Sequence, residues 1–204
     1  MSDLNKEINE QGEETEPKGS QVEISGTILT AEEMTPKKAL KQLRSVVNEY
    51  EDYVTVQSRR KTDKYFRDFV ILNLTKTNDK IKEIHSLLIE KQQMSTWASA
   101  DALINDIGLF LRDVVKGDFG FTTFFENPKL LEMDISQLYL VDNEILWSLG
   151  IIRERTEAFM EMCKFNYFED IDLWFETLNR ILGKLIQLNE DRIKLIGSYE
   201  RISY

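Results

Sequence analysis

Two pairs of acidic residues are the first candidates for chemistry in this chain. Glu154 and Glu157 form one pair, and Glu169 and Asp172 form the other. Residues three positions apart lie on the same face of a helix, so each pair presents two carboxylates in one direction. Carboxylate oxygens are the ligands that Mg²⁺ prefers, and a bound Mg²⁺ can orient and polarise a phosphate group. What matters is whether the supporting elements bring the two pairs together.

This pattern resembles that of the helical MazG-like nucleotide pyrophosphatases, which bind magnesium through acidic residues on adjacent helices. The resemblance covers four residues and implies a metal-dependent nucleotide hydrolase. Helix geometry gives a different prediction. At about 100° of rotation per residue, Glu154 and Glu157 lie roughly 120–180° from the apolar face of their helix, and the second pair is placed similarly. We therefore interpret the four carboxylates as a solvent-facing acidic surface and expect neither catalytic residues nor a metal or other cofactor.

The two pairs belong to a predicted helical hairpin, which extends from Asp134 to Tyr204 and should organise the fold. Apolar residues recur every three or four positions on both sides of residues 164–168, which is the period of one helix face. Such a short connection makes the two helices antiparallel neighbours. Each helix is about thirty residues, or roughly 45 Å, long. The outer edges of the hairpin must be covered by other helices.

Residues 35–116 are predicted to supply these helices. Thr35 and Pro36 form a good helix start, with threonine as the cap and proline in the first turn. Two apolar stripes, over residues 40–54 and 66–88, predict two helices with a break near residues 60–63. A single continuous helix over residues 36–93 is the alternative. A further helix is predicted for residues 97–116.

The first 34 residues have a different composition. Residues 1–20 are rich in Glu, Gln, Asn, Gly and Pro and contain almost no large apolar side chains, which predicts disorder. Residues 21–30 contain several aliphatic side chains, and they are either an unstructured apolar stretch or a short extended motif that docks on a helix groove or a sheet edge. The sequence thus predicts an all-α fold. A disordered acidic tail over residues 1–34 precedes an elongated antiparallel bundle of four to five helices over residues 35–204.

A phenylalanine-rich loop follows the helix predicted over residues 97–116. Residues 117–128 contain two glycines and four phenylalanines. One interpretation is a plug that closes the end of the bundle. The other is an exposed apolar lip that binds a partner or ligand. The candidate partner-binding residues are Phe119, Phe121, Phe124 and Phe125.

Charge is distributed unevenly along the chain. Residues 1–35 carry nine acidic and two basic side chains, residues 36–82 carry six acidic and twelve basic, and the remainder is acidic. The basic segment can simply complement the acidic parts of the same molecule. Alternatively, it binds nucleic acid or an acidic protein surface, with the tail as a competitor. The candidate residues on its helix faces are Lys37, Lys41, Arg44, Arg60, Lys64 and Arg67.

Several classes of protein are disfavoured by the composition. The single cysteine, Cys163, excludes an internal disulfide and a Cys-rich zinc site, and its apolar surroundings indicate a buried structural thiol. One histidine, His85, cannot supply the paired motifs of a di-iron bundle. The net charge of −10 disfavours a nucleic-acid binder that uses its whole surface. There is neither an apolar run of membrane-spanning length nor a secretory signal, so a cytoplasmic location is expected.

These observations favour a non-enzymatic interaction or assembly protein that acts through its helix faces. Its partner would be another protein, including a second copy of the same chain. The first alternative is an accessory protein that binds nucleic acid through the basic residues of 37–67. The second is the MazG-like metal-dependent pyrophosphatase.

Overall fold

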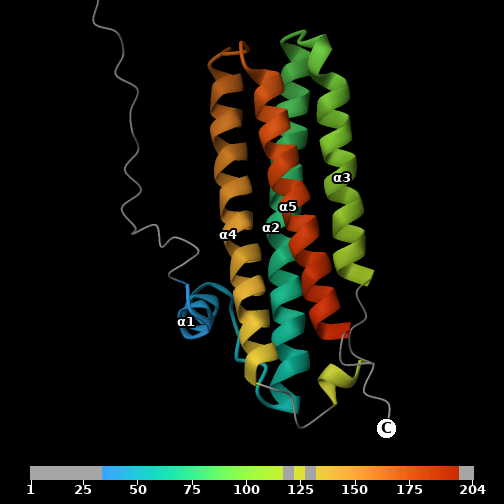
Figure 1. Cartoon of the computed structure of the whole chain (residues 1–204). Coiled ribbons are helices and arrows are strands. Elements are labelled where there is room, and N and C mark those ends of the chain that lie inside the picture. Colours follow the sequence, from blue (N-terminus) through green and yellow to red (C-terminus); the bar gives the residue numbers. More distant parts are fainter. Residues whose placement is uncertain (1–33, 117–121, 127–131, 198–204) are drawn as a thin grey trace, which may run out of the picture.

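The protein is an all-α bundle, as predicted (Figure 1). The structure, a computed structural model, describes residues 34–116, 122–126 and 132–197, without the side chains of 132–134. The disordered tail and extended motif predicted before Met34 lie outside these ranges. The described part contains no strand, and its elements are α1 (Pro36–Val46), α2 (Val56–Glu90), η2 (Met94–Thr96), α3 (Trp97–Lys116), η4 (Thr123–Phe125), α4 (Glu132–Lys164) and α5 (Ile171–Gly197).

Two antiparallel hairpins, α2–α3 and α4–α5, form the body of the bundle (Figure 1). They pack so that α2 lies beside α4 and α3 lies beside α5, and the helices in each of these two pairs run in the same direction. The predicted α4–α5 hairpin and its short turn are confirmed. So is the helix predicted over residues 97–116, which matches the bounds of α3.

The helices α3 and α4 lie at diagonally opposite corners of the bundle. The described part of the connection between them, η4, packs against α2 and α5. Phe124 and Phe125 are buried there, with their rings 5.0 Å apart in an edge-to-face arrangement. For these two residues the plug interpretation is confirmed. Phe119 and Phe121 lie outside the described residues.

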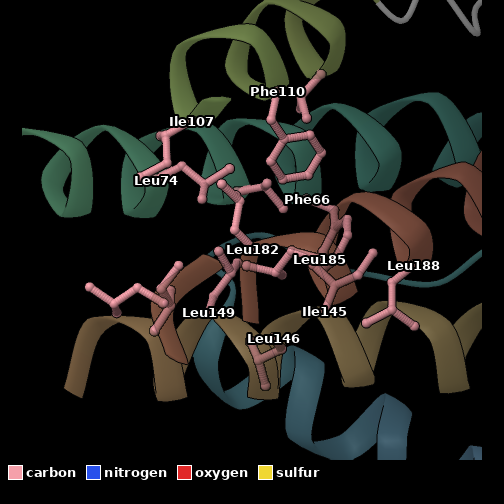
Figure 2. Close-up of a cluster of buried hydrophobic side chains, with 14 of the residues drawn as sticks. Phe66, Leu74, Ile107, Phe110, Ile145, Leu146, Leu149, Leu182, Leu185 and Leu188 are labelled. Atoms are coloured by element: carbon pink, nitrogen blue, oxygen red, sulfur yellow. The ribbon is translucent and has the colours of Figure 1, made fainter. Parts of the chain in front are cut away.

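The core between the two hairpins is filled by aliphatic and aromatic side chains from all four long helices (Figure 2). Leu74 and Ile107 come from α2 and α3, and they face Leu149 and Leu182 from α4 and α5. Each fully buried side chain of this size contributes about 1.5–3 kcal/mol to stability. Leu146 differs from these residues because it extends from the other side of α4 toward α1.

The break between the first two helices lies earlier than predicted. The expected break near residues 60–63 and the alternative single helix over 36–93 are both wrong, because α1 ends at Val46 and α2 begins at Val56. Glu49 in the connection has a φ of 58°, which a continuous α-helix does not allow. The α2 N-terminus is held by a reciprocal capping box between Thr55 and Ser58.

The short helix α1 lies beside the first half of α4 and packs mainly on that helix (Figure 1). Its start is as predicted: Thr35 caps the N-terminus through its side chain, and Pro36 occupies the first turn. Ala39 and Leu43 form its buried face. Because α1 is much shorter than α4, it covers only part of the outer face of that helix.

Candidate functional site

A buried ionic network fixes the connection that joins α1 to α2. We define this network as Tyr50, Tyr53, Asp63, Asp142 and Arg192, which come from the connection, α2, α4 and α5. Arg192 Nε donates to Asp142 Oδ1 at 2.6 Å, and Arg192 Nη2 lies 2.8 Å from Asp63 Oδ1. The Tyr50 and Tyr53 hydroxyls donate to Asp142 Oδ2 at 2.8 and 2.6 Å. The connection is thus bonded to a charged pair that joins α4 to α5.

Burial and charge act in opposite directions on the pKa values of the network. Burial raises the pKa of Asp142, whereas Arg192 and the two tyrosine hydroxyls stabilise its charged form. Burial alone would lower the pKa of Arg192, but Asp142, Tyr53 and Asp63 hold it well above its usual value. Burial and the Asp142 charge raise the pKa values of Tyr50 and Tyr53 well above the ordinary range. Arg192 therefore stays protonated and both tyrosines stay neutral near pH 7.

Arg59 supplies a second set of buried contacts to the same connection. Its guanidinium donates to the Tyr53, Val54 and Phe124 carbonyl oxygens at 2.8, 3.0 and 2.8 Å. Arg59 is 1% exposed, so these carbonyl bonds replace the water that a buried cation would otherwise need. One side chain thereby ties the α1–α2 connection to η4 at the closed end of the bundle.

The ionic network is enclosed within the bundle, because its five residues are all buried. Asp63 also accepts a 2.9 Å hydrogen bond from Arg67 Nε. These contacts are suited to positioning α1 against α4.

The position of α1 leaves a groove beside it, between α2 and α4. This α2–α4 groove has a volume of about 670 Å³, which is within the range of small-ligand sites and suits a few side chains. It begins at α1 and continues along α4 as far as Glu157. Its lining residues are Gln42, Val46, Phe69, Asn73, Leu146, Trp147, Leu149, Gly150, Ile151, Arg153, Glu154, Arg155 and Glu157.

Large apolar side chains are exposed in the α2–α4 groove. Val46, Trp147 and Ile151 are 50%, 37% and 39% exposed, and Phe69 is partly buried beside them. Gly150 lies between Trp147 and Ile151, and a Cβ added there would meet no atom within 4 Å. The groove therefore has an apolar floor, with open space where Gly150 lacks a side chain.

Charged residues bound the groove at its far end. Arg153, Glu154, Arg155 and Glu157 form a rim of mixed charge, with Arg153 Nε 3.9 Å from Glu157 Oε1. Beyond this rim, a shallower hollow is lined mainly by charged residues, including Lys80 of α2. The apolar stretch of the groove thus ends within α4, and a ligand that matches it must be short.

The six predicted basic residues are distributed over two helices that do not form a common packed face. Lys37, Lys41 and Lys64 are exposed on α1 and α2. The three arginines pair with carboxylates of the same chain: Arg44 with Asp52 at 3.1 Å, Arg60 with Glu126 at 3.2 Å, and Arg67 with Asp63 at 2.9 Å. Half of the proposed basic surface therefore complements acidic groups within the molecule.

The remaining predicted residues occupy places that do not build a second site. Phe124 and Phe125 are buried in the plug and are not available as an exposed lip. The four carboxylates at 154, 157, 169 and 172 are all exposed, with the second pair at the start of α5 and its turn. Among the described residues, no group of three or more His, Cys, Asp or Glu side chains is placed to share a metal ion.

The single cysteine and the single histidine are both placed on the long helices, and the cysteine is buried as predicted. Cys163 is free and fully buried, and burial raises the pKa of its thiol to about 11. His85 is partly buried on α2, with Nδ1 3.4 Å from the Asp101 carboxylate on α3. None of the described helices combines the length and apolarity that crossing a bilayer requires.

The ionic network and the groove were both absent from the sequence predictions. Asp142 and Arg192 could have been found, because each interrupts the apolar stripe of its own helix and the two have opposite charges. The sequence contains no comparable signal for the groove, because the groove depends on where α1 ends and on how α1 lies across α4.

Comparisons of the chain with protein-family models, curated proteins and solved structures found no match. Its function must therefore be inferred from its own residues.

Proposed function

We propose that the protein is a non-enzymatic interaction protein that binds a short apolar segment of a partner protein in the α2–α4 groove. The exposure of Val46, Trp147 and Ile151 in one concave site carries this proposal. Large apolar side chains that gather in a hollow with a charged rim are a frequent property of protein-binding sites. Tryptophan is also among the residues that most often contribute strongly to binding.

The size of the groove indicates a short segment as the ligand. A stable interface between two globular surfaces buries about 800 Å² on each partner. That is more than a hollow lined by thirteen residues of α1, α2 and α4 provides. The lining residues of α4 run from Leu146 to Glu157, which corresponds to roughly 16 Å of helix. A few residues of an extended chain or three turns of helix fill that length.

The proposal is tested by selecting ligands from a displayed library of random peptides with the full-length protein. We expect enrichment of peptides that carry two or more large apolar residues. The groove is then filled by Gly150→Leu, which removes binding of the selected peptides. The matched control is Gly108→Leu on α3, where an added Cβ also meets no atom within 4 Å but which does not line the groove.

Both variants replace glycine in a helix by a better helix former, so neither is expected to unfold the protein. Equal binding by the Gly150→Leu and Gly108→Leu variants, or failure to select any peptide, contradicts the proposal. Circular dichroism of both variants confirms that their helical content is unchanged.

The nucleic-acid alternative has weaker support, because Arg44, Arg60 and Arg67 already have carboxylate partners. It predicts that deleting residues 1–34 strengthens retention on DNA or RNA at low salt, since the acidic tail would compete for the same basic surface. The pyrophosphatase alternative predicts magnesium-dependent release of pyrophosphate from nucleotides. Either result would replace the proposal made here.

A further inference from the structure

We propose that the α2–α4 groove is occupied in the free protein by residues 22–29 of the same chain, which a partner segment must displace. This inference rests on the proposed function, because it names an internal competitor for the same groove. Three observations point to this occupant: its pattern of side chains, the reach of the intervening chain, and the length of the groove.

Residues 22–29 have the pattern of an extended segment with one apolar side. Val22, Ile24 and Ile28 alternate with polar residues, and Gly26 occupies the remaining position on the same side. Successive side chains of an extended chain point to opposite sides, so these aliphatic groups would all face one surface. Residues 1–20 contain no similar pattern, and this segment is therefore the only strong apolar candidate before α1.

The chain between this segment and α1 is long enough to reach the groove. Met34 is partly buried against the core, which fixes where the tail meets the bundle. Ile28 lies six positions before Met34, and an extended chain spans up to about 20 Å over that distance. Gln42, which begins the groove, lies six residues after Pro36 and therefore roughly 9 Å farther along α1. The tail is therefore long enough to turn back along α1 and bring Ile28 into the groove.

The groove is long enough for most of the segment. Residues 22–29 span about 23 Å as an extended chain. The groove follows α4 for roughly 16 Å, which accommodates the six residues from Ile24 to Leu29. The rim presents Arg153 and Arg155 together with two glutamates, so it does not exclude a segment that contains only one acid, Glu23. The apolar floor is what selects the occupant.

The test is disulfide cross-linking in the full-length protein, with Ile28→Cys combined with Ile151→Cys in the groove. The control combines Ile28→Cys with Leu109→Cys on α3, because Leu109 is 43% exposed and Ile151 is 39% exposed. The native thiol of Cys163 is buried and does not compete. Docking holds the two groove cysteines at high local concentration, so we expect the monomeric cross-link to form roughly tenfold faster than in the control.

A further pair of variants tests whether the alternating pattern is responsible. Ile24→Asp places a charge on the apolar side of the segment and reduces the cross-linking rate to that of the α3 control. Ser25→Asp adds the same charge on the opposite side and leaves the rate high. Equal rates for the groove and α3 pairs overturn the inference. Cross-linked dimers as the main product also overturn it, because the occupant would then be the tail of a second copy.

Failure of this inference is distinguishable from failure of the proposed function. The peptide selection is repeated with a full-length Ile24→Asp variant, whose groove would be free of the tail. Stronger peptide binding by this variant than by the unaltered chain supports an internal competitor, and unchanged binding contradicts it. If groove-specific cross-linking is observed but this variant selects no peptide, the tail docks and the proposed partner binding is wrong.

Discussion

Arg192 is the residue on which the buried ionic network depends most. It contacts Asp142, Asp63 and the Tyr53 hydroxyl, and its guanidinium lies 5.0 Å from the centre of the Phe66 ring. Removing charged groups from water is costly, so a buried pair of this kind need not add to net stability. Its geometry is nevertheless specific, because Asp142 accepts three hydrogen bonds from three separate side chains. We infer that the network selects one position for the α1–α2 connection.

Replacing Arg192 by methionine should be strongly destabilising. The change leaves Asp142 buried without its cation and leaves Asp63 with Arg67 alone. The loss of one partner of a buried pair typically costs about 3–5 kcal/mol. Urea unfolding followed by circular dichroism measures this loss. Lys194→Met on the same helix is the control, because Lys194 is exposed and its loss should cost less than about 1 kcal/mol. Similar losses of stability in the Arg192→Met and Lys194→Met variants would show that the buried ionic network depends no more on its cation than the surface does on an exposed lysine.

A double-mutant cycle separates the pair from its surroundings. Adding Asp142→Asn to the Arg192→Met variant removes one uncompensated charge, so the double variant should lose less stability than the two single variants added together. An additive result would mean that Arg192 acts mainly through packing on Phe66.

At the scale of single elements, the sequence predicted what local rules determine. The bounds of α3 and the start of α1 follow from capping residues and apolar periodicity, and both were correct. The α1–α2 break was misplaced because Val47, Tyr50 and Tyr53 repeat the three-residue spacing of a helix while lying buried in a non-helical connection. Thr62 and Asp63 have the residue types of a helix cap, but they are buried inside α2. Long-range contacts, not local preference, decide these positions.

Helix α1 should be able to detach from α4 while the four long helices stay packed. It packs mainly on α4, and Leu146 lies between the two helices (Figure 2). Truncation by Leu146→Ala removes apolar contact at this interface, and a cavity of this kind typically costs about 2–5 kcal/mol. We expect hydrogen exchange to accelerate in residues 36–46 while α3 keeps its protection. Hydrogen–deuterium exchange with mass spectrometry measures both regions.

Ile145→Ala provides the comparison for that variant. Ile145 lies one position away but faces the core beside Leu185 and Leu188 (Figure 2). Its truncation should accelerate exchange throughout the four long helices. If the Leu146 and Ile145 variants give the same exchange pattern, α1 is not a separate unit.

At the scale of the whole molecule, the sequence indicated the fold class but not the α2–α4 groove. Four long amphipathic helices predict a bundle, because each must bury one face. The α2–α4 groove exists where a fifth, shorter helix stops covering α4. Neither the end of α1 nor its placement on α4 is encoded in the apolar stripe of α4 itself. Trp147 and Ile151 are exposed on α4, and single exposed apolar residues are common on protein surfaces, so their sequence positions do not indicate a groove.

Stability of the whole bundle should fall at alkaline pH. Burial raises the pKa of Cys163 to about 11, and Tyr50 and Tyr53 are shifted upward for the same reason. The native state then keeps protons that the unfolded chain releases above about pH 9 for the thiol and pH 10 for the tyrosines. Rising pH therefore favours unfolding, and the thiol alone should lower stability by about 2–3 kcal/mol by pH 11.

The contribution of the thiol is isolated with Cys163→Ala. Urea unfolding at pH 8, 9 and 10 gives the slope of stability against pH for each protein. The alanine variant has no thiol to titrate, so its stability should fall less between pH 8 and 10, whatever its starting value. Identical slopes would show that Cys163 gains access to solvent without unfolding of the bundle.

The contact between Arg192 and Tyr53 joins residues 139 positions apart, nearly the full span of the ordered helices. Closing so long a loop is entropically costly, whereas each hairpin can form from nearby residues. The two hairpins should therefore assemble first, with the ionic contacts made only after the rate-limiting step of folding. Damage to those contacts should shorten the lifetime of the native state while leaving the speed of its formation almost unchanged.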